Sequence, residues 1–391
     1  MAKVGCYLKL PFKMATRGLS TACVQYAPSS NIPGKPWREA ASLILVSPTP
    51  LPGTENPSKK PHFLMTERSQ GGGAFSKLVC FPGGNVDEAD HDKEWLDKFA
   101  LATGHYIENG VTFIKDEGKN PKIYVGAKHN IPKVLSLRIT AIRETFEETG
   151  ILLCKEFRRE NFGRGLGKDS KLETGSDATV APFQDQDELA YWQDRVRKDP
   201  NQFMKMCEDR VILPDVNALV EWNSWLTPNS WQTRYDTIFY MAFVPEAYQP
   251  VICEKEMKSA HWLTAEKMLQ ECEQRTFKMI APQIYELTRM KSASLTSLRN
   301  LMRIRLKLGI EGWCPCYIQA QDGYLSVFPG DDLYPDDMDI TKFEPIRKNN
   351  ATLDELRDTT KNHHRIQYRN EFDFSILIKN YKERMGHIYL D

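Results

Sequence analysis

The sequence lacks the features that mark membrane-spanning, secreted and nucleic-acid-binding proteins. No run of eighteen apolar residues occurs among its 391 positions, which excludes a transmembrane helix. Lys and Arg together number 52, as do Asp and Glu, so the protein has no broad field that attracts nucleic acid. Its nine cysteines include no CxxC pair, which favours a reducing compartment over a disulfide scaffold or a zinc site. We therefore expect a soluble protein without a nucleic-acid partner, in which a local cluster binds any anionic ligand.

Acidic residues are absent from the first 38 positions, although these contain six Lys or Arg. Such a segment resembles a mitochondrial transit peptide, and Arg17-Gly18-Leu19-Ser20 is similar to a presequence processing site. The last residues, Tyr389-Leu390-Asp391, do not form the Ser-Lys-Leu signal of peroxisomal import, so a peroxisomal location is the less favoured alternative. We interpret residues 1–36 as a basic leader or a disordered arm, and expect a mitochondrial location.

The rest of the chain has an alternating pattern of short apolar stretches and amphipathic segments. Two apolar stretches, 41–46 and 62–66, predict the strands of one hairpin, because a Pro-rich turn separates them. Further strands are predicted at 151–153, 237–244 and 260–263, and helices near 95–102, 184–210 and 264–273. Strands that alternate with few helices indicate a mixed α/β sandwich.

One predicted helix concentrates acidic residues on one edge. Glu144 and Glu148 lie one above the other at helical spacing, and Glu147 lies beside them. The opposite face is apolar, with Ile139, Ile142 and Phe146. Three neighbouring carboxylates repel one another unless a cation neutralises them, and oxygen ligands of this kind suit Mg²⁺ or Mn²⁺. A solvated acidic face is the alternative interpretation for such a helix taken alone.

The segment Arg143–Ile151 and the upstream pair Gly83-Gly84 together resemble the Nudix box. Its usual form is Gly, five residues, Glu, seven residues, then Arg-Glu-(apolar)-x-Glu-Glu-x-Gly-(apolar). The second half matches at Arg143, Glu144, Glu147, Glu148, Gly150 and Ile151. Asp90 stands where the first Glu is expected, and 58 residues separate Gly84 from Arg143 where the unbroken box has 13. The box is therefore interrupted, and its halves can meet only if the extra segment bulges outward.

The resemblance implies a role for each part of the box. Glu144, Glu147 and Glu148 would bind divalent cations that bridge a diphosphate and activate water, with Glu144 and Glu147 catalytic. Arg143 would orient these carboxylates, and Gly83 with Gly84 would let the backbone approach the metal or phosphate.

A further carboxylate is expected to assist from outside the box. Glu254 and Glu256 precede the strand predicted at 260–263, and either could supply the remote ligand or general base of related enzymes. Glu256 is our candidate. A plain surface Glu is the alternative.

The residues before the box resemble the signature of coenzyme A diphosphatases. Leu64–Ser69 matches Leu-Leu-Thr-x-Arg-Ser, and the spacing to Phe81-Pro82-Gly83-Gly84 is preserved. Gly73 replaces an Arg of the signature, and Lys77 replaces a Gly. Arg68 remains the candidate for the substrate phosphates, since a guanidinium binds them with two parallel bonds.

Most of the chain resembles the nucleoside diphosphate-linked moiety X motif nineteen branch of Nudix hydrolases, which are acyl-CoA diphosphatases. The resemblance implies hydrolysis of CoA or acyl-CoA to 3′,5′-ADP and (acyl-)4′-phosphopantetheine. Another nucleotide substrate, such as NADH or ADP-ribose, and a non-catalytic nucleotide-binding module are the alternatives.

The branch implies a Nudix α/β/α sandwich with a mixed sheet at 37–290. We expect an inserted lobe at about 87–132 and a loop and helical insertion at about 158–215. A mainly helical C-terminal accessory region is expected at 291–391. It begins with an amphipathic helix that ends at Gly309, followed by short strands near 316–320 and 324–328, with His363-His364 as a surface pair. The oligomeric state is left open.

Overall fold

The computed structural model describes eleven stretches of the chain, and these form two compact units. The described residues are 37–53, 60–69, 78–103, 129–156, 175–228, 230–231, 233–253, 256–310, 312–336, 338 and 345–381. The larger unit contains the described parts of 38–226 and 235–313, and the smaller one contains Trp37 and those of 227–234 and 314–381. The basic leader lies outside the described residues.

A mixed eight-stranded sheet forms the centre of the larger unit. Its strands run in the order β10-β7-β8-β1-β2-β3, with β4 paired to β1 and β9 to β2. Their bounds are β1 (Arg38–Ser47), β2 (His62–Arg68), β3 (Val79–Cys80), β4 (Gly83–Asn85), β7 (Val220–Leu226), β8 (Tyr235–Phe243), β9 (Met257–Thr264) and β10 (Gly312–Trp313). The pairs β1–β8 and β10–β7 are parallel, and the others are antiparallel.

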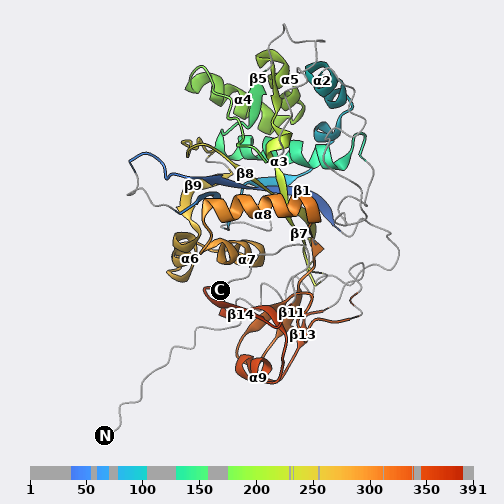
Figure 1. Ribbon diagram of the computed structural model, residues 1–391, viewed down its shortest axis with the longest axis vertical. Coiled ribbons are helices and arrows are strands. Elements are labelled where there is room, and N and C mark those ends of the chain that lie inside the picture. The colour runs from blue at the N-terminus through green and yellow to red at the C-terminus, as the bar shows by residue number, and fades with distance from the viewer. Residues whose placement is uncertain are drawn as a thin grey trace. The chain divides into compact units, whose positions relative to one another are not determined.

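Helices cover both faces of this sheet, as Figure 1 shows, so the predicted α/β/α sandwich is confirmed. Above the sheet in that view lie α2 (Glu94–Thr103), α3 (Lys133–Thr149), α4 (Gln186–Lys198) and α5 (Asn201–Arg210). Below it lie α6 (Ala265–Glu273), α7 (Ala281–Met290) and α8 (Leu295–Leu308). Short elements complete the unit: η2 (Glu88–His91), η5 (Val216–Ala218) and the two-stranded sheet of β5 (Cys154–Glu156) and β6 (Ile212–Pro214).

The hairpin predicted from the two apolar stretches is present as antiparallel β1 and β2. The prediction of a strand at 151–153 is wrong. Regular strand pairing begins only at Cys154, and Leu153 makes a single bridge to Val180. The helical segment predicted at 184–210 is two helices, since Asp199 ends α4 in an extended conformation and Pro200 starts α5.

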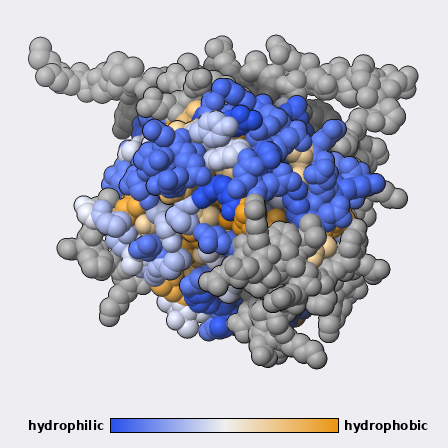
Figure 2. Space-filling view, turned by 90° about the horizontal axis from the view of Figure 1, so that it is seen from above, coloured by the Kyte–Doolittle hydropathy of each residue, from blue (hydrophilic) through white to orange (hydrophobic). Residues whose placement is uncertain are grey.

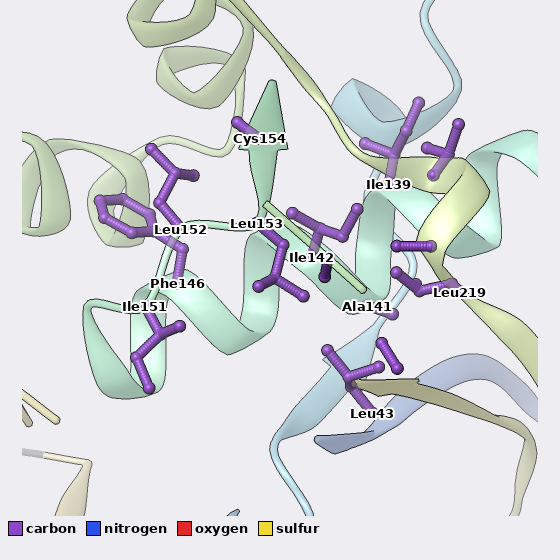
Figure 3. Packing of buried hydrophobic residues seen from close by; sticks show 14 of the residues in the cluster. Leu43, Ile139, Ala141, Ile142, Phe146, Ile151, Leu152, Leu153, Cys154 and Leu219 are labelled. Carbon is purple, nitrogen blue, oxygen red and sulfur yellow. The ribbon is translucent and has the colours of Figure 1, made fainter. Parts of the chain in front are cut away.

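Helix α3 is buried on almost every side, with fifteen of its seventeen residues inside the protein. Apolar residues of α3 pack with those that follow it, and Figure 3 shows Ile142 and Phe146 beside Leu152 and Leu153. The helix ends where the sequence predicts, at Gly150, whose φ of 70° is left-handed and whose N–H donates to the Phe146 carbonyl. The acidic edge is thus carried by a rigid core element.

The smaller unit is mainly a β-structure, so the prediction of a mainly helical region was wrong. Five strands form its sheet in the order β13-β11-β12-β14-β15. They are β11 (Cys316–Gln319), β12 (Tyr324–Val327), β13 (Arg347–Lys348), β14 (His363–Asn370) and β15 (Asp373–Lys379), beside one short helix, α9 (Leu353–Asp358). His363 and His364 are buried on β14, 4% and 0% exposed, so they are not a surface pair.

Polar residues dominate the face that Figure 2 presents, which carries only scattered hydrophobic patches. Helix α4 has the same division between a polar surface and an apolar core. Its buried apolar residues are Leu189, Trp192 and Val196, as their spacing predicts. Within the described part of the chain, no helix has the length and apolar character needed to cross a bilayer.

Candidate active site

The double-glycine turn lies directly against the first strand of the sheet. Gly83 and Gly84 open β4 and pair with Ser42 and Ala41 of β1. A Cβ on Gly83 would overlap the carbonyl oxygen of Ala41, so the close backbone approach requires glycine here.

The acidic edge of α3 meets this turn despite the interrupted box. A Cβ on Gly84 would overlap the carboxyl group of Glu144, so this side chain lies on the glycine backbone. The side chains of Glu144, Glu147 and Glu148 are 18%, 10% and 3% exposed. They do not form a solvated acidic face.

Arg143 lies at the centre of the cluster and contacts three carboxylates. Its Nη1 is 3.0 Å from an oxygen of Glu144 and 2.5 Å from one of Glu147. Its Nε and Nη2 bind the two oxygens of Asp90 at 2.7 and 2.8 Å, and Nη2 also donates to the Asn85 carbonyl at 3.1 Å. The arginine therefore links the turn, the helix and η2.

Asp90, which replaces the first Glu of the box, is fully engaged in structure. Besides the two bonds from Arg143, its Oδ2 accepts from Thr140 Oγ1 at 2.8 Å and from the backbone N–H of Asp87 at 2.9 Å. The residue is 1% exposed. The shorter carboxylate therefore still reaches the arginine, and its contacts assign it to positioning.

Glu148 is held by β2 and by the glycine turn. Thr66 Oγ1 and the Gly83 N–H donate to Oε2 at 3.2 and 3.4 Å, and Arg68 Nη2 pairs with Oε1 at 2.9 Å. Thr66 and Arg68 both belong to the segment that resembles the coenzyme A signature. Here that segment binds the acidic helix.

Burial raises the pKa of each box glutamate. The pKa of Glu147 is raised to about 7 and that of Glu148 to about 8, because removal from water disfavours the charged carboxylate. Arg143 and Arg68 oppose these shifts only in part. The pKa of Glu144 is also raised by burial. A site that crowds buried carboxylates in this way is favourable for an added cation.

The donor set suits a hard divalent cation, since every box ligand is an oxygen. Among the described residues, no group of three His, Cys, Asp or Glu side chains converges closely enough to hold a metal ion. The ion pairs give the reason, because Glu147 faces Arg143 and Glu148 faces Arg68. Binding of a cation would therefore require these contacts to rearrange.

Glu256 lies at the rim of the site. Its carbonyl accepts from the Ser69 N–H at 2.9 Å, and its exposed side chain contributes to the raised pKa of Arg68. Within the described residues, no hydrogen bond or ion pair joins its side chain to the box. Glu254, Gly73 and Lys77 lie outside the described residues.

The two ends of the inserted segment are tied to the sheet and to each other. His129 Nε2 lies 2.7 Å from Glu39 of β1, and Lys133 Nζ lies 2.6 Å from the other oxygen of that carboxylate. The rings of His91 and His129 stack with their centroids 4.6 Å apart. These contacts close the base of the interruption, so Gly84 and Arg143 remain neighbours.

Sequence reasoning missed several residues that shape the site. Thr140, Glu39 and His129 carry no local pattern that distinguishes them from other polar residues. For Thr66 a signal existed, since it ends the strand predicted at 62–66 and Arg68, two positions further on, would point to the same face.

Comparison with known proteins identifies relatives over nearly the whole chain. The family model described as the NUDT19 Nudix domain matches residues 37–290, and that of the NUDT19 C-terminal domain matches 318–379. A curated Xenopus laevis protein, acyl-coenzyme A diphosphatase NUDT19, is 30% identical over 359 residues, 85% of this chain and 90% of that protein. The human protein of that name is 29% identical, covering 90% and 94%.

A solved NUDIX hydrolase from Alicyclobacillus acidocaldarius is also similar, with 19% identity and a TM-score of 0.47, covering 68% of this chain and 96% of that one. The matched Nudix region contains the glycine turn, Arg68 and the acidic helix. The chain belongs to the NUDT19 family of Nudix hydrolases.

Proposed function

We propose that the protein hydrolyses the diphosphate bond of CoA or acyl-CoA, with Mg²⁺ or Mn²⁺, to give 3′,5′-ADP and (acyl-)4′-phosphopantetheine. The observation that carries the proposal is the packing of Glu144, on its buried acidic helix, against Gly84. The names of the relatives supply the substrate class.

The three box glutamates are the proposed cation ligands. Glu144, Glu147 and Glu148 would hold a divalent cation, which would neutralise diphosphate charge and lower the pKa of water, so that the hydroxide formed on loss of a proton could attack phosphorus. Gly83 and Gly84 leave the backbone bare where phosphate oxygens would approach. In the metal-free protein, Arg143 holds the carboxylate of Glu147 through its 2.5 Å contact.

Glu147 is the proposed acceptor of the proton released by the attacking water. Arg143 holds this carboxylate at 2.5 Å, and burial raises its pKa in the metal-free protein, so the carboxylate accepts a proton readily. Glu256, at the rim beside Ser69, is the alternative acceptor. The leaving phosphate departs as an anion, so the reaction does not require a strong acid.

The experiment is a substrate panel with the purified full-length chain. CoA, several acyl-CoA esters, NADH and ADP-ribose are incubated with Mg²⁺ or Mn²⁺, and products are identified by chromatography and mass spectrometry. We expect 3′,5′-ADP from the CoA compounds and none after addition of EDTA. If NADH or ADP-ribose were hydrolysed faster than the CoA compounds, that nucleotide would become the assigned substrate. If no compound were hydrolysed, the result would support a non-catalytic binding module.

We also propose that residues 1–36 direct the protein to mitochondria, because this segment is cationic and free of acids. Fused to a fluorescent reporter, the segment is expected to colocalise with a mitochondrial marker. A diffuse or peroxisomal signal for the full-length fusion would contradict it.

A further inference from the structure

The two oxygens of Glu148 have partners of different kinds. Oε2 is held by neutral donors, Thr66 Oγ1 at 3.2 Å and the Gly83 N–H at 3.4 Å. Oε1 is paired with a cation, Arg68 Nη2 at 2.9 Å. The neutral donors can hold the carboxylate in place whether or not the arginine stays.

Strand β2 builds this arrangement through its alternation. Thr66 and Arg68 are two residues apart, so both side chains reach Glu148 from one face of the strand. Glu67, between them, binds Lys258 at 2.8 Å and Ser259 at 2.9 Å. The strand thus places Arg68 within reach of the acidic helix.

Arg68 is the more exposed partner of the pair. Its side chain is 27% exposed, whereas that of Glu148 is 3% exposed. Its Nη2 makes both bonds described for it, to Glu148 and to the Gly83 carbonyl at 3.0 Å. Within the described residues, neither Nε nor Nη1 has a hydrogen-bond partner, so that edge of the guanidinium can bind an anion.

We propose that Arg68 is the exchangeable counter-ion of Glu148: it neutralises Oε1 in the metal-free protein and transfers to a substrate phosphate when a divalent cation binds. The inference rests on the proposed function. A guanidinium and a divalent cation repel each other and cannot both occupy Oε1 at close range. The negatively charged diphosphate then replaces Glu148 as the partner of Arg68.

Metal and substrate binding become coupled through this exchange. A cation at Glu148 releases Arg68 for the phosphate, and a phosphate that captures Arg68 releases Oε1 for the cation. The coupling is reciprocal, because both ligands favour the same position of the arginine. It also accounts for the absence, in the described residues, of three carboxylates converged on a metal position.

Crystals of the full-length protein soaked in MnCl₂ test the exchange directly through the anomalous signal of manganese. We expect manganese at the acidic edge of α3, with Arg68 Nη2 moved out of hydrogen-bond range of Glu148 Oε1. Manganese with the Arg68–Glu148 contact intact would overturn the inference alone. Failure to find manganese at this edge would overturn the proposed metal site as well.

A kinetic test uses Arg68→Lys, which keeps the charge but loses the planar fork. We expect KM for CoA to rise about 10-fold and kcat to change less than about 3-fold, because the lost bonds are made to substrate. Mn²⁺ affinity without substrate, measured by electron paramagnetic resonance, should stay within about 2-fold. Lys258→Gln, a neighbouring exposed cation bound to Glu67, is the matched control and should change none of these values.

A fall in kcat or in Mn²⁺ affinity with unchanged KM would overturn the inference, because it would mean that Arg68 only positions Glu148. A wild-type protein that turns over CoA but binds no Mn²⁺ would instead contradict the metal role in the proposed function.

Discussion

The carboxyl group of Glu144 lies on the backbone of Gly84, so closely that a Cβ at position 84 would overlap it. The two residues are far apart in sequence and on opposite sides of the inserted segment. Their contact joins the two halves of the interrupted box into one site.

Gly84→Ala should therefore disrupt the site more than the fold. The added methyl group must displace Glu144, and we expect activity on CoA to fall about 100-fold, since small misplacements of this size are costly. The loss of unfolding free energy should be about 1–2 kcal/mol, from overpacking. Gly312→Ala, whose Cβ would lie 3.6 Å from Ser224 Oγ, is the control. Equal activity of the two variants would show that a bare backbone at position 84 is not needed for catalysis.

Glu148→Gln keeps the shape of the side chain and removes its charge. We expect hydrolysis to fall roughly 1000-fold, about 4 kcal/mol in barrier height, because a cation ligand is lost. Circular dichroism should remain that of the parent. Glu266→Gln, at an exposed ion pair with Lys60, should keep full activity. If Glu148→Gln hydrolysed CoA at the rate of the parent protein, the acidic edge of α3 would have no role in the mechanism.

Asp90→Asn should destabilise the protein by about 3 kcal/mol, because Arg143 would be left buried without its main counter-ion. Asp354→Asn is the matched control, since its pair with Arg357 is exposed and should contribute less than about 1 kcal/mol. Chemical denaturation measures both. If the two substitutions cost the same, Asp90 does not have the positioning role that its contacts indicate.

The stability of the metal-free protein should depend on pH through Glu147 and Glu148. Their folded pKa values of about 7 and about 8 lie above the ordinary 4.5, so the folded state holds these protons more tightly. Their contribution is complete below about pH 4.5 and is lost as pH rises through 7 and 8.

In EDTA, the melting temperature should therefore fall between about pH 4.5 and about pH 8, and less so with Mg²⁺ present. The double variant Glu147→Gln/Glu148→Gln should flatten this part of the profile. A melting temperature in EDTA that rises over the same interval, with the parent and the variant parallel, would contradict the assignment.

The sequence predicted the acidic helix well because its signals are local. Ile139, Ile142 and Phe146 repeat at helical spacing, and Gly150 supplies the left-handed C-cap. The contacts that the helix makes with distant segments could not be predicted from local signals. That Asp90 binds Thr140, or Arg68 binds Glu148, depends on how distant segments pack.

Strands near 316–320 and 324–328 were predicted and are present as β11 and β12, whereas β14 was missed for a related reason. β14 is buried but carries polar residues, including His363, His364 and Arg365, so no alternation of apolar and polar residues marks it. Arg365 is buried because Asp331 pairs with it at 2.6 Å, a partner that periodicity cannot supply. The ion pair with a distant residue therefore allows a polar segment to form a buried strand.

The stacked rings of His91 and His129, with the Glu39 bond beneath them, form a closed neck from which the interrupting segment departs. Beyond this neck α2 still contributes Trp95 and Phe99, 1% and 7% exposed, to the core, so the first part of the segment cannot be replaced without loss of packing. A change of chain length after α2 would add only a slowly growing entropic cost, because the neck already holds the two catalytic halves together.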